Sequence, residues 1–289
     1  MLVKQRRLKI SSGTLFGIGG GAFLVLTAAL MLTTSSSDSA LPACEARYPS
    51  AGLFALERSS GKLLDSGTLQ AKLAGSDWGL IDNVSVVPAT RNGAALRVNF
   101  AAGGNYDAAR RTASGGFGFL WRPGFLTATS AACLSYSVRL PNDFDFAGGG
   151  TLPGLFGDGN PSARGGHAFS TRMRWLGDGK VAVQPVVANE AQSKPLPVDP
   201  NWLTLSRGKW IDVEQEVVLN DPGKANGRIR VWIDGKLHYD AGNLTLRASD
   251  DVRVSGVIAD THYGDKAMAW QAAPKDARVE ISPFLLRWR

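Results

Sequence analysis

The stretch GGGTLPGLFG, at residues 148–157, decides how the rest of the chain is interpreted. Glycines at this density cost backbone entropy and bury no side chain, so they are expected where another backbone or a ligand must come close. The sequence FSTRMRW, at 169–175, then alternates as a strand does, with Ser170, Arg172 and Arg174 opposite the apolar positions. One face can pack a core and the other can offer guanidinium groups to an anion. Together the two segments predict the floor of a groove.

Beyond residue 47 the chain reads as short strands separated by turns, with no long helical period. The expected strands are 77–81, 95–100, 134–140, 169–175, 181–187, 210–219, 228–233, 236–239, 252–259 and 279–288. Asp178-Gly179 and Asp234-Gly235 are strong signals for two-residue hairpins. Many short strands punctuated by glycine and proline are typical of a sandwich or jelly roll. We therefore expect an all-β, concanavalin-like jelly-roll sandwich.

The N-terminal region predicts a membrane segment. Residues 14–33 are apolar or small and uncharged. A stretch of this length is long enough to cross a bilayer as a helix. The basic residues before them, at positions 4, 6, 7 and 9, indicate that the N-terminus stays in the cytoplasm and the rest is periplasmic or extracellular. A cleaved signal peptide is the alternative. The expected parts are a basic N-terminus at 1–13, a transmembrane anchor at 14–33, a linker at 34–46 and one jelly-roll domain at 47–289.

Charge and cysteine content narrow the class of ligand. The formal net charge is +7, and four of these charges lie before residue 10, so the domain itself is mildly basic. This mildly basic charge suits an acidic glycan as ligand. The sequence lacks the basic clusters with interleaved aromatic residues that indicate nucleic-acid binding. Cys44 and Cys133 could form one disulfide in an oxidising compartment. Two isolated cysteines make a poor metal site, so neither a metal nor a cofactor is expected.

Several motifs resemble polysaccharide lyase family 14, whose members are β-jelly-roll enzymes that cleave alginate-like polyuronates. They are YSVRLP at 136–141, DFDF at 143–146, GGGTLPGL at 148–155, FSTRMRW at 169–175, GKW at 208–210, VLN at 218–220 and VWIDG at 231–235. The resemblance covers roughly residues 133 to 289. It implies the same fold and an anionic, uronate-containing polysaccharide as partner.

The resemblance also bears on activity. Arg172 matches the family arginine, whereas the family lysine of GGGKLPG, implicated in catalysis, is here Thr151, and VAVQ at 181–184 replaces a Tyr-x-Tyr pair. One hypothesis is a membrane-anchored, extracytoplasmic lyase-like protein that acts by β-elimination. The alternative is a non-catalytic glycan-binding or exopolysaccharide-export accessory module. A third hypothesis is a β domain that scaffolds an envelope complex; the sequence names no protein partner.

β-Elimination requires a donor that neutralises the uronate carboxylate, a base for the C5 proton and an acid for the leaving oxygen. The expected catalytic residues are Arg172, His167, His262 and Tyr263. The expected substrate-binding residues are Thr151, Arg174, Gln184 and Lys180. In purely structural terms, the arginines could form a solvated strand face and His167 could be an exposed loop histidine.

Glycoside hydrolysis is a weaker hypothesis. A retaining hydrolase needs two carboxylates about 5 Å apart. Asp212, Glu214 and Glu216 share one face of an expected strand, although three like charges in a row more often mark a solvent-facing surface. If these acids lie on the convex sheet, away from the groove, hydrolysis is excluded.

Overall fold

The computed structural model describes residues 44–73, 77–104, 106–107, 112–113, 115–126, 129–157, 169–187, 196–197, 203–264 and 272–289. The expected membrane segment at 14–33 lies outside these residues and stays a prediction. Among the residues described, no helix is both long enough and apolar enough to cross a membrane.

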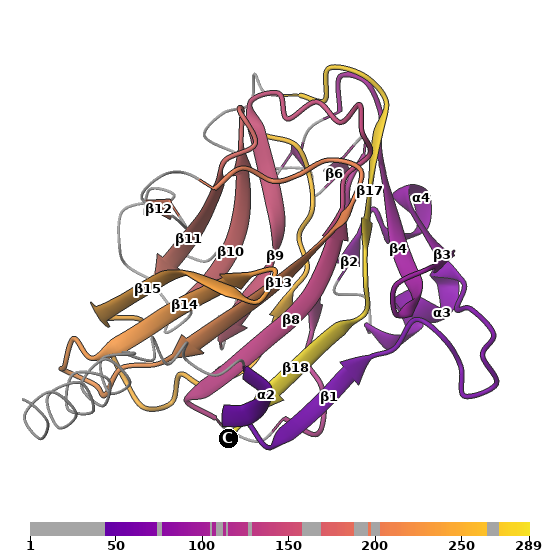
Figure 1. Ribbon diagram of the computed structural model, residues 1–289. Coiled ribbons are helices and arrows are strands. Elements are labelled where there is room, and N and C mark those ends of the chain that lie inside the picture. Colours follow the sequence, from indigo (N-terminus) through magenta and orange to yellow (C-terminus); the bar gives the residue numbers. More distant parts are fainter. Residues whose placement is uncertain are drawn as a thin grey trace, which may run out of the picture. The chain divides into compact units, whose positions relative to one another are not determined.

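The described strands form two antiparallel sheets that pack face to face (Figure 1). Sheet I contains β1 (Ser50–Phe54), β3 (Val84–Ala89), β4 (Gly93–Phe100), β8 (Ala131–Arg139), β13 (Trp210–Val218), β14 (Gly227–Ile233), β15 (Lys236–Leu244), β17 (Ala277–Ile281) and β18 (Phe284–Trp288). Its order is β15-β14-β13-β8-β17-β4-β3, with β18 paired to both β8 and β1.

Sheet II contains β2 (Asp77–Trp78), β7 (Gly118–Trp121), β9 (Gly149–Gly157), β10 (Phe169–Leu176), β11 (Val181–Val187), β12 (Leu196–Pro197) and β16 (Val254–Ile258). Its order is β12-β11-β10-β9-β16-β7-β2. A separate short pair joins β5 (Tyr106–Asp107) and β6 (Thr112–Ala113). The helices described are short: α2 (Cys44–Arg47), α3 (Ser66–Lys72) and α4 (Leu80–Asn83). The expected all-β sandwich is confirmed and its layers are consistent with a jelly roll.

Several expected strands have different bounds in the structure, and two of them are divided or cut short. The segment 279–288 is divided into β17 and β18 at Ser282-Pro283, where proline offers no amide hydrogen to a neighbouring strand. The segment 77–81 stops at Trp78, because Gly79 takes a left-handed conformation (φ 67°) and starts α4. In both places local backbone chemistry overrides the apolar pattern.

A buried glutamine fastens the two sheets together. Gln215 of β13 is fully buried, and its Oε1 accepts hydrogen bonds from Thr171 Oγ1 (3.0 Å) and from the amide of Leu155 (3.2 Å). Its Nε2 donates to the carbonyl of Thr171 at 2.7 Å. Because both ends of the amide are satisfied, the group is not a buried polar defect. It fixes β13 against β9 and β10 across an otherwise apolar core.

The glycine-rich stretch is a strand, β9, and every residue of it is buried. A Cβ on Gly150 would lie 2.0 Å from the Trp175 ring, and one on Gly154 would lie 2.1 Å from the carbonyl oxygen of Thr171. Both neighbours belong to β10. The close approach expected at these glycines is therefore made by another part of the chain, which allows β10 to lie tightly against β9.

The expected two-residue hairpin at Asp234-Gly235 is confirmed, whereas the turn at Asp178-Gly179 contains three residues, 177–179, because the Leu176 amide donates to the Lys180 carbonyl. Asp234 and Gly235 have φ of 49° and 77°, as a primed two-residue turn between β14 and β15 requires. In the turn between β10 and β11, Gly179 takes a positive φ of 79°. These turns set the register of the strands that carry the arginines.

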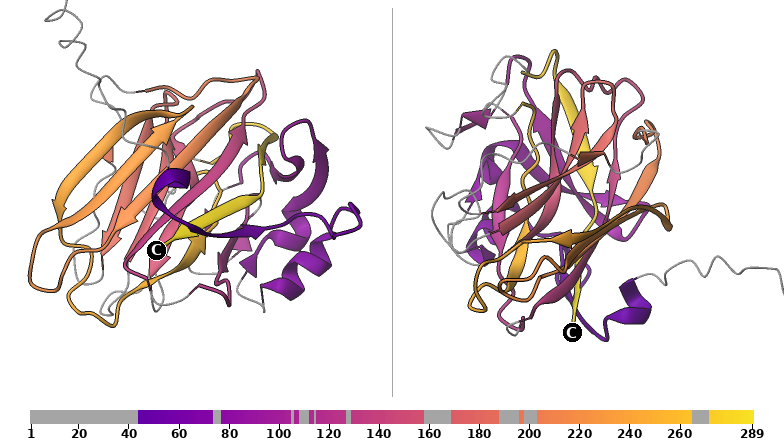
Figure 2. Two further views of the ribbon diagram at one scale, coloured as in Figure 1. Left: turned by 60° about the horizontal axis from the view of Figure 1, so that its bottom comes forward. Right: turned by 90° about the vertical axis from the view of Figure 1, so that its left-hand side faces the viewer.

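The expected disulfide is confirmed. Cys44 in α2 is bonded to Cys133 in β8, at a sequence separation of 89 and a Cα–Cα distance of 6.1 Å. In the left view of Figure 2, α2 lies in front of β8 and β18, on the outside of sheet I. The start of the domain is thus fastened covalently to the face of sheet I that points away from sheet II.

Candidate functional site

The arginine strand has the two faces that its sequence predicts. Phe169, Met173 and Trp175 belong to the buried apolar core between the sheets. Arg172 and Arg174, at the alternate positions, therefore project from the opposite side of sheet II. We call this side, which points away from sheet I, the site face.

Arg172 is held in place by two side chains of the site face. Its Nε donates to Asp260 Oδ2 at 2.8 Å, and its Nη1 donates to Ser170 Oγ at 3.0 Å. The side chains of Arg172 and Asp260 are 15% and 17% exposed. The pair is therefore partly shielded from water while still reachable from solvent.

Arg174 lies beside it and is only 2% exposed. Its Nη1 donates to Gln184 Oε1 at 2.9 Å, so two residues expected at the site are in direct contact. The strand register places Thr151 of β9 opposite Arg174 on the other side. Thr151 is 3% exposed, and its hydroxyl has no hydrogen-bond partner among the described residues.

His262 joins the site face from the segment that follows β16. Thr261 exchanges both backbone hydrogen bonds with Phe117, at 2.8 and 3.0 Å, and the amide of Thr151 donates to the His262 carbonyl at 3.0 Å. Thr261 is fully buried, so alternation directs Asp260 and His262 outward. His262 is therefore the sheet neighbour of Thr151.

The charge state of His262 follows from its surroundings. Burial lowers its pKa below the ordinary value, Asp260 and the Tyr263 carbonyl oppose this, and Arg174 and Arg172 lower it further. Nδ1 lies 3.1 Å from the carbonyl oxygen of Tyr263, which can only accept. Nδ1 therefore carries the proton of the neutral ring, and the lone pair is on Nε2.

Tyr263 is not a groove residue, which corrects the expectation. Its ring packs in the core against Phe100, Phe144 and Trp175, and its hydroxyl donates to the carbonyl of Asp145. Burial raises the pKa of its phenol. Adjacent residues of an extended segment point in opposite directions, so His262 and Tyr263 do not share a face.

The remaining expected residues are less central. Lys180 lies at the β10–β11 turn, is 38% exposed at its side chain and pairs with Asp178 at 2.6 Å. His167 lies outside the described residues, so its role stays a prediction.

Asp260 and Trp78 were not anticipated from the sequence. A Cβ on Gly118 of β7 would lie 2.4 Å from Asp260 Oδ1 and 2.2 Å from Trp78 Nε1, so both groups occupy the space above this glycine. The Trp78 ring centroid is 5.8 Å from that of His262. Alternation from His262 could have indicated Asp260, but no local pattern indicates that β2 brings Trp78 to the same place.

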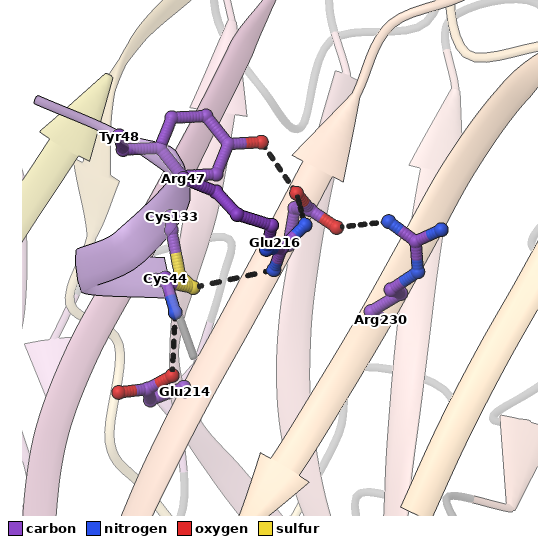
Figure 3. Close-up of a disulfide and its surroundings, with 7 residues drawn as sticks. All are labelled: Cys44, Arg47, Tyr48, Cys133, Glu214, Glu216 and Arg230. Atoms are coloured by element: carbon purple, nitrogen blue, oxygen red, sulfur yellow. Dashed lines mark hydrogen bonds and ion pairs between the residues drawn. A yellow bond between two sulfur atoms is a disulfide. The ribbon is translucent and has the colours of Figure 1, made fainter. Parts of the chain in front are cut away.

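The hydrolase hypothesis is wrong. Glu216 is on β13 of sheet I, on the face that α2 covers, and it is 2% exposed. It accepts hydrogen bonds from Arg47, from Tyr48 Oη (2.5 Å) and from Arg230 Nη1 (2.7 Å), as Figure 3 shows. Glu214 accepts from the amide of Cys44 at 3.3 Å. Glu214 and Glu216 thus hold the N-terminal helix on the sheet opposite the arginines, and Asp212 on the same strand pairs with Arg91, so all three acids lie away from the site face.

Metal-ligand spacing occurs among the described residues at Cys44, Cys133 and Glu214. Both sulfur atoms are taken up by the disulfide, so no thiolate is offered to a metal. The grouping is part of the covalent fastening of α2.

The two-sheet antiparallel sandwich places the chain in the class of jelly-roll-like all-β proteins, with Arg172 and Arg174 on the side of sheet II that faces away from sheet I. The family model for polysaccharide lyase 14 matches residues 88–284, and the chain belongs to this family. Among curated proteins, none matches the sequence significantly.

Solved structures show the same fold. A PL-14 alginate lyase from Aplysia kurodai is 23% identical over 76% of this chain and 94% of its own, with a TM-score of 0.62. Alginate lyase vAL-1 from Chlorella virus is 19% identical over 77% and 97%, with a TM-score of 0.60. A variant of alginate lyase Aly36B in complex with alginate trisaccharide is 18% identical over 84% and 99%, with a TM-score of 0.63.

Proposed function

We propose that the protein is a membrane-anchored, extracytoplasmic lyase that binds a uronate-containing polysaccharide on the site face and cleaves it by β-elimination. The observation that carries the proposal is the arrangement of Arg172, Arg174, Gln184 and His262 on one face of sheet II, in a chain of this lyase family. Guanidinium groups match planar carboxylates in both charge and geometry, which favours an anionic sugar.

The chemistry assigns each group a task. Arg172 neutralises the C6 carboxylate, which makes the C5 proton acidic and stabilises the enediolate. Nε2 of His262 takes the C5 proton, the electron pair forms the C4=C5 double bond and the C4–O bond breaks. The leaving oxygen takes up one proton, which the imidazolium can return. The products are a new chain end and an unsaturated uronate.

The charge state of His262 supports its role as the base. A base must be unprotonated at the working pH, and burial together with the two arginines lowers the pKa of His262. Asp260 limits this effect, so the ring keeps some basicity. The residue thus stands in for the lysine and tyrosines that Thr151 and the VAVQ segment replace.

The proposed location rests on two features. The uncharged stretch at 14–33 is long enough to span a bilayer, with basic residues before it. The Cys44–Cys133 disulfide is expected in an oxidising compartment and rare in the cytosol. Both support a domain outside the cytoplasm.

A non-catalytic glycan-binding or export-accessory module is the second candidate. Arg174, Thr151 and His262 are only 2%, 3% and 6% exposed, which limits the contact that a substrate makes with them. In this candidate Arg172 remains the anion-binding group and no proton is removed.

One experiment separates the two candidates. The purified full-length protein is incubated with a panel of polyuronates, and absorbance of the unsaturated product is followed together with binding. Arg172→Ala is compared with Arg97→Ala, whose arginine pairs with Glu280 on sheet I at 2.8 Å. Absorbance lost only in Arg172→Ala supports the lyase. Binding without absorbance supports the second candidate. If the protein shows neither binding nor absorbance, both candidates are contradicted.

A further inference from the structure

Asp260 stands between the two groups to which the proposed function gives tasks. It contacts Arg172 directly, and its charge acts on His262 two residues further along the chain. Neither the family motifs nor the spacing of other residues in the sequence identifies Asp260 as a site residue. Its place in the site follows from sheet pairing alone, because 88 residues separate it from Arg172.

The backbone around Asp260 is held firmly. Thr261, the next residue, is buried and makes two backbone hydrogen bonds with Phe117, and the Ala259 amide donates to Phe119 at 2.9 Å. Asp260 lies between these two anchored positions. Its carboxylate is therefore carried by a fixed edge of β16 and β7 rather than by a free loop.

The path from Asp260 to Arg172 crosses β9 at a glycine. Gly154 is paired with Arg172 on one side and, on the other, with Ile258, which lies two residues before Asp260. Any Cβ on Gly154 would strike the Thr171 carbonyl. The same glycine thus permits tight packing between the strands.

The geometry fixes the guanidinium from two sides. Asp260 accepts from Nε and Ser170 accepts from Nη1, so two of the three nitrogen atoms have defined directions. A planar group held at two atoms cannot rotate about its last side-chain bonds without losing a hydrogen bond. Arg172 is thereby oriented before a ligand arrives, which reduces the entropy that binding must remove.

We propose that Asp260 is a positioning residue of this site, which orients Arg172 and sets the charge around His262. The inference deepens the proposed function and rests on it for its catalytic consequence. Asp260 does not touch the reacting atoms: it acts through the guanidinium that neutralises the uronate and through the imidazole that removes the proton.

The predicted consequences have a definite sign. Without the negative charge, the site face becomes more positive, which offsets the additional cost of ordering Arg172, so a polyanion binds equally well or more tightly. Arg172 loses the partner of Nε, so the transition state is stabilised less. The groups acting on His262 are Asp260, Arg172, Arg174 and the Tyr263 carbonyl, and removal of Asp260 leaves the two cations less opposed. The midpoint of its titration then moves to lower pH.

The test compares Asp260→Asn with a matched control, Glu280→Gln. Glu280 is 14% exposed and accepts hydrogen bonds from Arg97 and Arg139. It therefore forms a similar ion pair on sheet I, away from the site face. We measure kcat and KM on the cleaved polyuronate, thermal unfolding, and the titration of His262 by NMR, assigned with His262→Gln. Asp260→Asn should lower kcat by about 100-fold, as small misplacements of catalytic groups do, without raising KM. Asp260→Glu should recover part of the loss.

Two results overturn the proposal. One is an Asp260→Asn protein with the kcat and the His262 titration of the wild type. The other is an equal loss in Glu280→Gln, which would indicate a general effect on stability. If the wild-type protein cleaves no polyuronate, the proposed function fails, and the titration alone decides: a midpoint at lower pH in Asp260→Asn supports the charge coupling, and an unchanged midpoint overturns it.

Discussion

The outer face of sheet I and the site face of sheet II both set arginines beside carboxylates, yet they balance charge differently. On sheet I, Glu216 receives hydrogen bonds from Arg47, Tyr48 and Arg230, and Arg230 also lies 3.2 Å from Asp240. Burial and the nearby Glu216 raise the pKa of the Tyr48 phenol. The hydrogen bonds of this network join groups of the protein to one another and hold α2 on sheet I.

On sheet II, the described contacts of Arg172 and Arg174 are to Asp260, Ser170 and Gln184. One of these partners is charged and two are neutral. Hydroxyl and amide groups orient a guanidinium without cancelling its charge. The two faces differ in the described groups around their arginines: a carboxylate shared by Arg47 and Arg230 on sheet I, and hydroxyl and amide groups beside one carboxylate on sheet II.

The largest effect on stability is expected at the disulfide. Replacing Cys44 and Cys133 by serine opens a closed loop of 89 residues and should lower the free energy of unfolding by about 4.6 kcal/mol in the chain-entropy account. Urea unfolding of the variant and the wild type measures it. In the fraction that remains folded, kcat should be unchanged, because the bond lies on sheet I. A loss of kcat would show that the two faces are coupled.

Glu216→Gln should have the next largest effect. The carboxylate is 2% exposed, and its loss removes one negatively charged partner from both Arg47 and Arg230, which are 19% and 13% exposed. We expect the free energy of unfolding to fall by about 3 kcal/mol, near the lower end for a broken buried pair because both arginines keep some contact with water. Urea unfolding measures this change as well.

The control for this variant is Glu214→Gln, two residues away on the same strand. Its carboxylate accepts one hydrogen bond, from the Cys44 amide at 3.3 Å, so about 1 kcal/mol or less is expected. Equal losses in the two variants would contradict the special role of Glu216 in holding α2.

Much of the fold followed from local patterns. The alternation at 169–175 identified the two faces of the arginine strand, and the pair of cysteines left one possible disulfide. The glycines at 148–157 correctly indicated a close approach, but the approaching group is β10 with Trp175. A local pattern shows that space is needed and does not show what fills it.

The site was less accessible to such reasoning. Arg172, Arg174, Gln184 and His262 could be proposed from sequence, and the structure brings them to one face. Asp260 and Trp78 reach it through the pairing of β9 with β16 and of β7 with β2, which no short motif encodes. The joint expectation for His262 and Tyr263 conflicted with the period of two in an extended segment.

Lowering the pH should reduce the free energy of unfolding through protonation of His262. Because burial lowers its pKa below the unfolded value of 6.5, the unfolded chain binds more protons between the folded pKa and pH 6.5. The contribution of this group is complete above pH 6.5 and is lost as the pH falls through that window. Unfolding measured over this range should be less pH-dependent in His262→Gln than in the wild type. Equal slopes in wild type and His262→Gln would exclude this contribution.

The smallest effect is expected for Lys180→Ala. Lys180 lies at the turn of the same β10–β11 hairpin that carries Arg174 and Gln184, but its ammonium is exposed and already paired with Asp178, whose pKa that contact lowers. Exposed pairs of this kind contribute little, so affinity for a polyuronate should fall by less than about 2-fold. Salt should reduce any contribution of Lys180 to the affinity, because exposed charges are screened. Binding measured at low and high salt, beside Arg172→Ala, tests this. A loss as large as that of Arg172→Ala would extend the ligand site along the hairpin to its exposed end, and the contrast between shielded and exposed cations would no longer hold.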